Sequence, residues 1–270
     1  MRFAINYSPQ AAALLAEQRI EIDLYKCPDW TDMVAEAQQQ RPVYIHFPIV
    51  IGLNKVAALD LAAIDGWLTR TDTPFVNAHF APCAPSFPSG VDRDGVIEQS
   101  VRELEILTRH FGTERVILEN VPYSHYEIKR QILKQGADAS VLRDVIAAAG
   151  CGLLLDVSHA VITCANTQQD YQTYLDMLPT HRLGELHITG IGDHPVLHER
   201  EDHLPLQEDD WARVEAVMGC IERGEWARPK TVALEYGGIG PSFEWRSESV
   251  VIAEQVPRLY ALCQHVAQKA

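Results

Sequence analysis

The chain has 270 residues, of which 47% are hydrophobic and 22% are charged, so it can bury a full core and is not expected to be disordered. Its 23 basic and 37 acidic residues give a net charge of −14, which disfavours nucleic acid and anionic membrane surfaces as partners. The start of the chain has no apolar signal region, and no apolar run reaches the ~18 residues of a membrane span, so we expect a cytoplasmic protein.

Short apolar runs alternate along the chain with segments of helical periodicity. This alternation is typical of βα units and a parallel sheet. Between two of the runs, Ile97, Val101, Leu104, Leu107 and Phe111 recur at the spacing of a helix. Eight runs are predicted as strands: residues 2–6, 20–25, 43–47, 75–80, 115–120, 152–156, 184–188 and 231–235.

Eight such units predict an α/β protein of the (β/α)₈ TIM-barrel class. A single domain over residues 1–270 is expected, because parallel barrels commonly use about 250 residues as one unit. An open doubly wound sheet is the alternative, but it predicts a glycine-rich turn after the first strand, where Asn6-Tyr7-Ser8-Pro9-Gln10 has no glycine. In a barrel the long segments after the strands, here 81–92, 121–138 and 189–209, form the functional rim.

Histidines and carboxylates close the predicted strands. A barrel would bring the carboxyl ends of its strands to one rim, where nitrogen and oxygen donors could share metal ions. The candidate ligands at these ends are His46, His79, Glu119, Asp156, His159, His187 and Glu235.

Each candidate also has a purely structural interpretation. A lone histidine on a strand is more often a hydrogen-bonded core residue than a ligand, but His46 and His79 stand at equivalent points of neighbouring strands. A buried carboxylate such as Glu119 needs a cation or several donors beside it. Arginines and lysines are scarce near these strand ends, which favours a metal over an ion pair inside the barrel.

Two spacings sharpen the metal hypothesis. Asp156 and His159 stand at a strand-to-loop transition, where a turn can direct both side chains to one ion or to two adjacent ions. Glu185 and His187 alternate with apolar residues, so both are expected to face the barrel interior.

The segment 193–203 is dense in donors, and solvated loop charge explains most of it. The exception is Glu201-x-His203, because an acidic residue two positions before a histidine can present both side chains to one site. Mixed carboxylate and imidazole ligands suit iron, zinc or manganese, and the donor set has capacity for more than one ion. The chain has no Gly-x-Ser-x-Gly elbow, Walker loop or HExxH motif, so other catalytic templates have little support.

Four segments resemble the multinuclear non-heme iron-dependent oxidative enzymes, a methanobactin-biosynthesis-type group of TIM barrels. They are VYIHFPIVIGL (43–53), VILENV (116–121), GCGLLLDV (150–157) and LGELHI (183–188). Enzymes of this group modify cysteine or other residues of ribosomal peptides, often with a partner protein that presents the peptide. The resemblance implies two or three transition-metal ions, with iron expected and zinc or manganese as alternatives.

A wider resemblance is to the xylose-isomerase-like TIM barrels, which include sugar isomerases, epimerases and apurinic-site endonucleases. It implies metal ligands at His46, His79, Glu119, Asp156, His187 and Glu235. The Asp156-x-x-His159 spacing and the acid-x-histidine pattern at Glu201 and His203 resemble the trinuclear zinc endonucleases in particular. The second predicted strand departs from the iron group, because the segment 20–30 lacks a glutamate-rich ending.

The leading hypothesis is therefore a metal-dependent oxidoreductase in which iron activates dioxygen and oxidises a bound peptide or small molecule, with a peptide-presenting partner protein. In it Asn77 and Asn120 orient the ligands or the substrate. The second hypothesis is a sugar isomerase or epimerase with Glu119 and Glu235 as proton carriers beside His187. An apurinic endonuclease ranks third because of the charge, and a ligand-binding barrel with structural histidines is the non-enzymatic alternative.

Overall fold

The structure is a computed structural model that describes residues 1–193, 200–240 and 246–269. The strands of its main sheet are β1 (Arg2–Asn6), β2 (Leu24–Cys27), β3 (Val43–Ile45), β4 (Val50–Ile51), β5 (Val76–Phe80), β6 (Val116–Asn120), β7 (Gly152–Asp156), β8 (Leu183–Ile188) and β11 (Thr231–Leu234). The α-helices are α1 (Pro9–Ala16), α2 (Thr31–Ala37), α3 (Leu61–Arg70), α4 (Arg93–Phe111), α5 (His125–Lys129), α6 (Ala139–Ala149), α7 (Val157–Thr167), α8 (Tyr171–Met177), α9 (Glu208–Glu222) and α10 (Ser249–Gln268).

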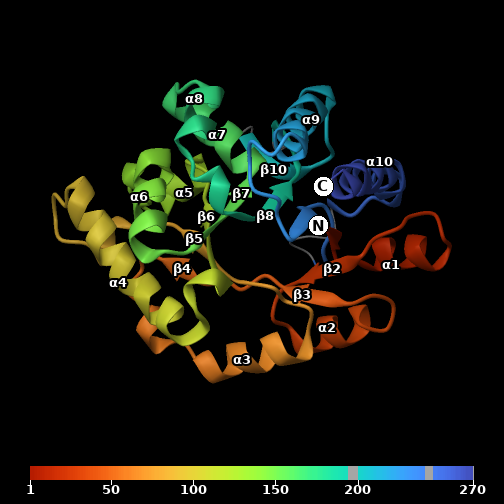
Figure 1. Ribbon diagram of the computed structural model, residues 1–270, viewed down its shortest axis with the longest axis horizontal. Helices are drawn as coiled ribbons and strands as arrows, with labels where there is room; N and C mark the ends of the chain where they lie inside the picture. The colour runs from red at the N-terminus through yellow and green to blue at the C-terminus, as the bar shows by residue number, and fades with distance from the viewer. Residues whose placement is uncertain (194–199, 241–245, 270) are drawn as a thin grey trace.

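The main sheet is curved, and the helices surround it on the outside (Figure 1). Its order over the described residues is β3-β2-β1-β11-β8-β7-β6-β5-β4, and every neighbouring pair is parallel. The two edge strands, β3 and β4, follow each other directly in the sequence. The predicted (β/α)₈ TIM-barrel class is confirmed, with the third strand of the barrel split into β3 and β4.

The helices begin and end at residues that the sequence marks. The side chain of Asp92 accepts a hydrogen bond from the Gly95 amide at the start of α4, and Gly112 ends the same helix with φ +90°. The predicted apolar stripe of α4 is buried or packed against the core. Among the described residues, no helix combines the length and the apolar character needed to cross a bilayer.

The third strand differs from its prediction, which placed one continuous strand over residues 43–47. The ladder to β2 continues to His46, whose amide donates to the Cys27 carbonyl, and it then stops. Pro48 has no N–H and cannot continue a ladder, so the chain resumes pairing with β5 only at β4. The predicted second strand was also placed too early. Asp23 donates its amide to the Phe3 carbonyl but accepts from the Phe3 amide with its side chain, and the register with β1 starts at Leu24.

The side chain of Asn77 joins the two halves of the third strand to β5. Its Oδ1 accepts from the Phe47 amide at 2.7 Å, and its Nδ2 donates to the Phe47 carbonyl at 3.1 Å. These bonds replace the backbone ladder where the strand is split, and Asn77 is only 2% exposed. The amide therefore connects β5 to the chain between β3 and β4, where the backbone ladder is interrupted.

Replacing Asn77 with alanine is expected to lower the free energy of unfolding by about 2–4 kcal/mol, because it leaves two buried backbone groups of Phe47 without a partner. Denaturant unfolding of the metal-free protein measures this. The control is Asn166→Ala, which removes a single exposed hydrogen bond to the Tyr123 carbonyl and should change stability by less than about 1 kcal/mol. Equal stabilities of the two variants would show that the amide bridge is dispensable.

The barrel interior has an apolar floor. Side chains of β1, β2, β3 and β11 form one small buried cluster, and those at the start of β5, in β6 and in β7 form another. The first cluster consists of Ala4, Leu24, Tyr44 and Ala233. The second consists of Phe75, Ile117 and Leu154. Because side chains alternate along a strand, the residue two positions further on faces the same interior at the carboxyl end.

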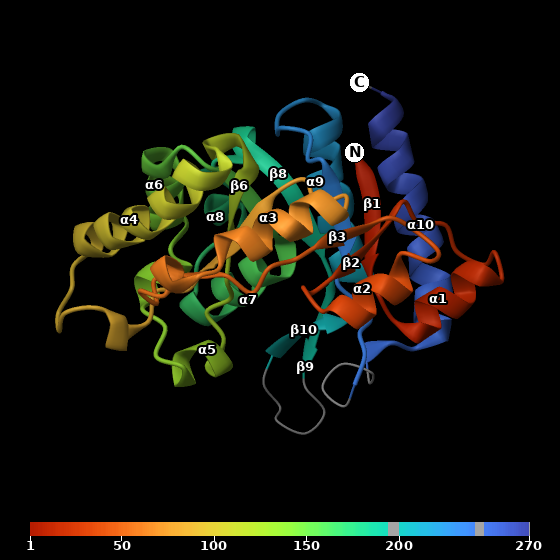
Figure 2. The same cartoon turned by 90° about the horizontal axis from the view of Figure 1, so that it is seen from below.

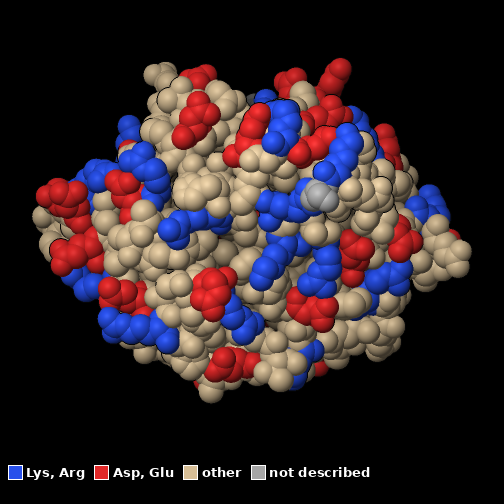
Figure 3. All heavy atoms as spheres, in the orientation of Figure 1, with Lys and Arg blue, Asp and Glu red and all other residues tan. Residues whose placement is uncertain are grey.

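The amino-terminal mouth of the barrel faces the viewer in Figure 1, and the β9–β10 hairpin lies at the opposite mouth (Figure 2). A hollow of ≈ 890 Å³ opens at the amino-terminal mouth, with Arg115, Arg182 and Lys230 in its lining. Lysine and arginine side chains lie around the centre of that face (Figure 3). Arg182 donates to the carbonyls of Gly150 and Cys151, which gives it a structural role.

Candidate metal centre

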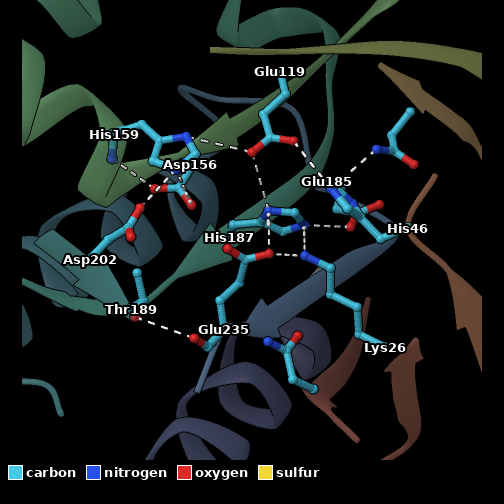
Figure 4. A network of polar contacts seen from close by, with 12 residues as sticks. Lys26, His46, Glu119, Asp156, His159, Glu185, His187, Thr189, Asp202 and Glu235 are labelled. Atoms are coloured by element: carbon cyan, nitrogen blue, oxygen red, sulfur yellow. Dashed lines mark hydrogen bonds and ion pairs between the residues drawn. The ribbon is translucent and has the colours of Figure 1, made fainter. Parts of the chain in front are cut away.

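The carboxyl ends of the barrel strands surround a cavity of ≈ 310 Å³. Histidines, carboxylates and one lysine from strands and loops that are far apart in the sequence point toward one another beside it (Figure 4). We call these side chains the cup: Lys26, His46, His79, Glu119, Asp156, His159, Glu185, His187, Asp202, His203 and Glu235. The cup lies directly above the apolar floor, because its members from β2, β5, β6 and β7, and those that directly follow β3 and β11, stand two or four positions after a residue of that floor.

Glu119, at the end of β6, lies in the middle of the cup and is 1% exposed. Its Oε2 lies 3.6 Å from His46 Nε2 and 3.4 Å from His79 Nε2. Its other oxygen, Oε1, lies 3.5 Å from His159 Nδ1 and 3.7 Å from His187 Nδ1. The two oxygens of one carboxylate therefore face two different groups of imidazoles, which is the arrangement of a bridging ligand.

The spacing of Asp156 and His159 follows from a helix cap. Asp156 ends β7 and caps α7, and its Oδ1 accepts from the His159 amide at 2.8 Å. The cap leaves Asp156 Oδ2 directed to the cup, 3.8 Å from His159 Nε2. The Nδ1 of His159 lies 2.7 Å from the Asn120 carbonyl, so this nitrogen carries the proton and Nε2 faces the cup.

The β9 (Gly190–Asp193) and β10 (Arg200–Leu204) hairpin supplies the remaining donors, in a rim segment that was predicted as a loop. The register of the pair shifts between Glu201 and Leu204, and His203 has a left-handed backbone with φ +58°. This bulge breaks the alternation of the strand, so that the neighbouring residues Asp202 and His203 both reach the cup. Asp202 Oδ2 lies 2.9 Å from His159 Nε2, and His203 Nδ1 lies 2.8 Å from the Glu235 carbonyl.

The acid-x-histidine pattern predicted Glu201 beside His203, and the acid that reaches His159 in the structure is Asp202. Glu201 is half-buried, and its negative charge acts on Arg246. A role for Glu201 as a ligand stays a prediction. The histidines and the acid at 194–199 of the same donor-rich segment lie outside the described residues.

His187, on β8, is fully buried and is held from two sides. Its Nε2 lies 2.7 Å from Glu185 Oε1, which also accepts from the Tyr44 hydroxyl at 2.9 Å. Its Nδ1 faces Glu119 and lies 3.1 Å from Glu235 Oε1. A carboxylate that binds one ring nitrogen of a histidine fixes the orientation of the other nitrogen toward a metal. Glu185 and His187 share the interior face, as the alternation predicted.

Two cations line the cavity at the strand ends, where the sequence predicted few. Lys26 lies near the end of β2, is 5% exposed, and forms an ion pair with Glu235 Oε1. Its Nζ also lies 3.3 Å from His187 Nε2. Arg246 lines the same cavity from the chain that precedes α10. An internal ion pair is therefore present beside the candidate metal ligands.

The pKa of Glu119 reflects opposing effects. Burial alone would raise this pKa, but the neighbouring His79 and His187 hold it well below its usual value. Burial raises the pKa of Asp156, and the negative charge of Asp202 adds to that rise, while His159 opposes it. Burial lowers the pKa of Lys26 to about 8, although Glu119 opposes this. The Glu119 carboxylate is thus ionised at neutral pH.

The histidines of the cup fall into two groups. Burial lowers the pKa of His46 well below its usual range and lowers that of His203 to about 3, so both rings are neutral at pH 7. Burial also opposes protonation of His159, but the adjacent carboxylates of Asp156 and Asp202 outweigh it and raise the pKa of His159 to about 10. The His159 ring is therefore protonated on both nitrogens and positively charged in the metal-free protein at pH 7.

The residues of the cup fit a metal ion. Three groups of side chains place one donor atom each within 4.8 Å of the others, and His46, Glu119 and His187 each belong to two of them. The groups are His46–Glu185–His187, His46–His79–Glu119 and Glu119–Asp156–His187. Within the described part of the chain, Glu119 Oε2, Asp156 Oδ2 and His187 Nδ1 are buried without a hydrogen-bond partner, which is costly unless a cation binds there. The carboxylates of the cup also outnumber its cations.

Metal binding at His159 is expected to release a proton, because an imidazole must be neutral to act as a ligand and this one is protonated up to pH of about 10. The affinity for Zn²⁺ should therefore rise with pH by up to roughly tenfold per unit between pH 7 and 8. Calorimetric titration in buffers of different ionisation enthalpy counts the released protons. The variant His159→Asn should bind Zn²⁺ with fewer protons released, and an unchanged count would exclude His159 as a ligand.

Asn77 and Asn120 both use their amides on the main chain. Asn120 accepts from the Asp156 amide at 2.8 Å and donates to the Asp156 carbonyl at 2.9 Å, and Asn77 bridges to Phe47. The Nδ2 of Asn77 also lies 3.3 Å from His46 Nε2. These contacts hold the strand ends that carry the candidate ligands. Direct contact of either amide with a substrate stays a prediction.

Comparison with known proteins places the chain among enzymes. A family model described as "RiPP precursor modification enzyme MbnB/TglH/ChrH" matches residues 88–223, half of the chain. A UPF0276 protein of Caulobacter vibrioides is 29% identical over 237 residues, which cover 70% of this chain and 80% of that protein.

Two solved structures show the fold alone. D-psicose 3-epimerase from Clostridium cellulolyticum, crystallised with D-tagatose, has a TM-score of 0.56 and 12% identity, over 99% of this chain and 96% of its own. Endonuclease IV from Thermus thermophilus has a TM-score of 0.55 and 14% identity, over 100% of both chains. Both belong to the xylose-isomerase-like TIM barrels that the sequence resembles.

Proposed function

This chain belongs to the family of RiPP precursor modification enzymes MbnB/TglH/ChrH, and we propose that it is a metal-dependent TIM-barrel enzyme that oxidises a peptide with iron held in the cup. The observation that carries the proposal is the position of Glu119. Its two oxygens face separate groups of imidazole nitrogens, and among the described residues the buried atoms Glu119 Oε2, Asp156 Oδ2 and His187 Nδ1 have no hydrogen-bond partner. Such a carboxylate can serve two metal ions at once.

The proposed ligands surround Glu119 on both sides. His46 and His79 complete the site at Oε2, and Asp156 and His187 complete the site at Oε1. His159, Glu201, His203 and Glu235 are proposed as further ligands at the hairpin side of the cup, where Asp202 Oδ2 lies 2.9 Å from His159 Nε2. Iron, with zinc or manganese as alternatives, suits this mixture of imidazole and carboxylate donors.

Bound iron would supply one-electron and dioxygen chemistry, which side chains alone do not provide. The protein's own contribution is proton handling and positioning. Glu185 accepts the proton of His187 Nε2 and so leaves Nδ1 for the ion, while Glu235 lines the cavity and can hold a proton beside the substrate. Lys26 and the apolar floor keep bulk water away from the lower side of the cup.

The cavity also indicates what enters it. Its volume of ≈ 310 Å³ is at the lower end of the range for ligand sites, so it accommodates one side chain or a small molecule and not a folded peptide. Trp30, Met33 and Ile239 line it with apolar surface, and Trp30 is 48% exposed at the rim. We propose that one side chain of a peptide enters while its main chain lies across the rim, held there by a partner protein that presents the peptide.

The test is oxygen dependence. Iron-loaded protein would be incubated with cysteine-containing peptides, including any small precursor peptide encoded near its gene, with and without a peptide-presenting partner protein, and the product would be examined by mass spectrometry. The proposal expects a mass change that requires dioxygen and iron. No change of the peptide in the presence of iron, dioxygen and partner, or a change that persists without dioxygen, would contradict it.

A second candidate function is sugar isomerisation or epimerisation. It is favoured by Glu119 and Glu235, two carboxylates that both line the cavity and could carry protons on either side of a substrate. This reaction would proceed anaerobically with manganese, and a ketohexose panel monitored by NMR would detect it. Oxygen dependence thus separates the two candidates.

A further inference from the structure

The hollow at the amino-terminal mouth lies at the opposite end of the barrel from the cup. Its volume of ≈ 890 Å³ falls within the range of ligand sites. Phe75 and Ile117 belong to the apolar floor and also line the hollow, so part of its wall is apolar. The same lining contains three cations, Arg115, Arg182 and Lys230. Lysine and arginine side chains gather at the centre of this face (Figure 3).

The chain does not neutralise these three cations. Acidic residues outnumber basic ones by 37 to 23, and most of the arginines form an ion pair. No ion pair joins Arg115, Arg182 or Lys230 to any residue that the structure describes. One carboxylate, that of Glu114, lines the hollow with them. The lining therefore has three cations against one carboxylate, in a protein whose net charge is −14.

Two of the cations are held in place by contacts that leave their charge intact. Arg182 Nη1 donates to the carbonyls of Gly150 at 3.1 Å and Cys151 at 3.2 Å, so its other nitrogens can still donate to a ligand. The Lys230 ammonium lies 4.6 Å from the centroid of the Phe75 ring, whose face attracts a cation without cancelling its charge. An anion in the hollow would thus meet cations that are already positioned.

Stabilisation of a helix end explains only one of these cations. Helix α6 ends at Ala149, and Arg182 binds the carbonyls that follow this end, where a positive charge is favourable. The side chains of Arg115 and Lys230 donate no hydrogen bond to the described part of the chain. Their charges therefore have no structural partner among the described residues.

We propose that the hollow at the amino-terminal mouth is a second binding site, which takes a small organic anion with two or more negative groups. The negative groups would bind Arg115, Arg182 and Lys230, and an apolar or planar part would lie against Phe75 and Ile117. Arginine binds phosphate and carboxylate oxygens with directed, charge-assisted hydrogen bonds. This inference does not rest on the metal centre, because none of these residues belongs to the cup.

Calorimetric titration of the metal-free protein tests the inference. The probes are ATP and tripolyphosphate, which has the same three linked phosphates and no apolar part. ATP should bind more tightly than tripolyphosphate, and both should bind more weakly as the salt concentration rises. Lys230→Gln and Arg115→Gln should each weaken the binding of ATP by about tenfold, because each removes one charged donor. The matched control is Lys55→Gln, an exposed lysine outside the hollow, which should bind ATP as the wild type does.

Thermal unfolding without ligand separates binding from a structural role of the cations. Arg115 is half-buried and Lys230 is exposed, so both variants should unfold at the temperature of the wild type. ATP should raise the unfolding temperature of the wild type more than that of either variant. The inference is overturned if neither probe binds more tightly than about 1 mM at an ionic strength of about 0.1 M. It is also overturned if tripolyphosphate binds as tightly as ATP, or if both variants keep the affinity of the wild type.

Discussion

Replacing Glu119 with glutamine is expected to abolish stoichiometric metal binding and, with it, activity. Both candidate groups on either side of Glu119 use this carboxylate, so its loss removes a charged ligand from both at once. Substitution of a residue that only supports a ligand typically weakens metal binding by about 10–100-fold. Loss of a ligand that two sites share should therefore lower the affinity for metal by more than about 100-fold. Glutamine has nearly the same volume, so the barrel should still fold.

Metal content after reconstitution, together with a competition titration against a chelator, measures the effect. The control is Glu103→Gln. Glu103 is also a buried carboxylate, but it lies on α4, outside the cup, and accepts from the amides of Gly52 and Asn54. That variant should lose stability while keeping its metal. If Glu119→Gln binds metal as the wild type does, Glu119 is not the bridge.

Replacing Gly190 with alanine is expected to displace the β9–β10 hairpin while the barrel remains folded. A Cβ at Gly190 would lie 2.1 Å from the Pro205 carbonyl oxygen and 2.5 Å from that of Leu204, and both are backbone atoms that cannot turn aside. The hairpin would have to shift, and Asp202 and His203 would shift with it. A functional site tolerates displacements of its side chains of only about 0.5 Å. The activity of Gly190→Ala should therefore fall by more than about 100-fold.

Gly66→Ala is the matched control, because a Cβ in that helix would meet only the end of the Arg70 side chain at 4.0 Å. Thermal unfolding should show that both variants are folded, and the turnover of Gly190→Ala should fall alone. Wild-type turnover of Gly190→Ala would show that Asp202 and His203 do not take part. The comparison separates the hairpin's contribution from that of the barrel.

The strands and most of the cup could be predicted from the sequence because they obey simple periodicities. Parallel strands buried on both faces appear as short apolar runs, and a polar residue at the end of such a run must have a partner. The pair Asp156 and His159 could be predicted for a different reason, because an N-cap carboxylate accepts from the amide three residues later at the start of a helix. Local rules were sufficient for these residues.

Other features depend on tertiary contacts that no local pattern contains. The approach of Asp202 to His159 follows from a bulge and a left-handed His203, whereas the sequence pattern assumes regular alternation. Lys26 was overlooked because its partner, Glu235, is distant in the sequence. The split of the third strand had one local signal, Pro48, but its closure by the Asn77 amide requires knowledge of the neighbouring strand.

The most direct test of the metal centre is anomalous X-ray diffraction at the iron edge from crystals of the iron-loaded protein. We expect two peaks, one between Glu119 Oε2 and the rings of His46 and His79, and one between Glu119 Oε1, Asp156 and His187. Fully loaded protein without an anomalous peak in the cup, or with its iron bound elsewhere on the barrel, would contradict the account.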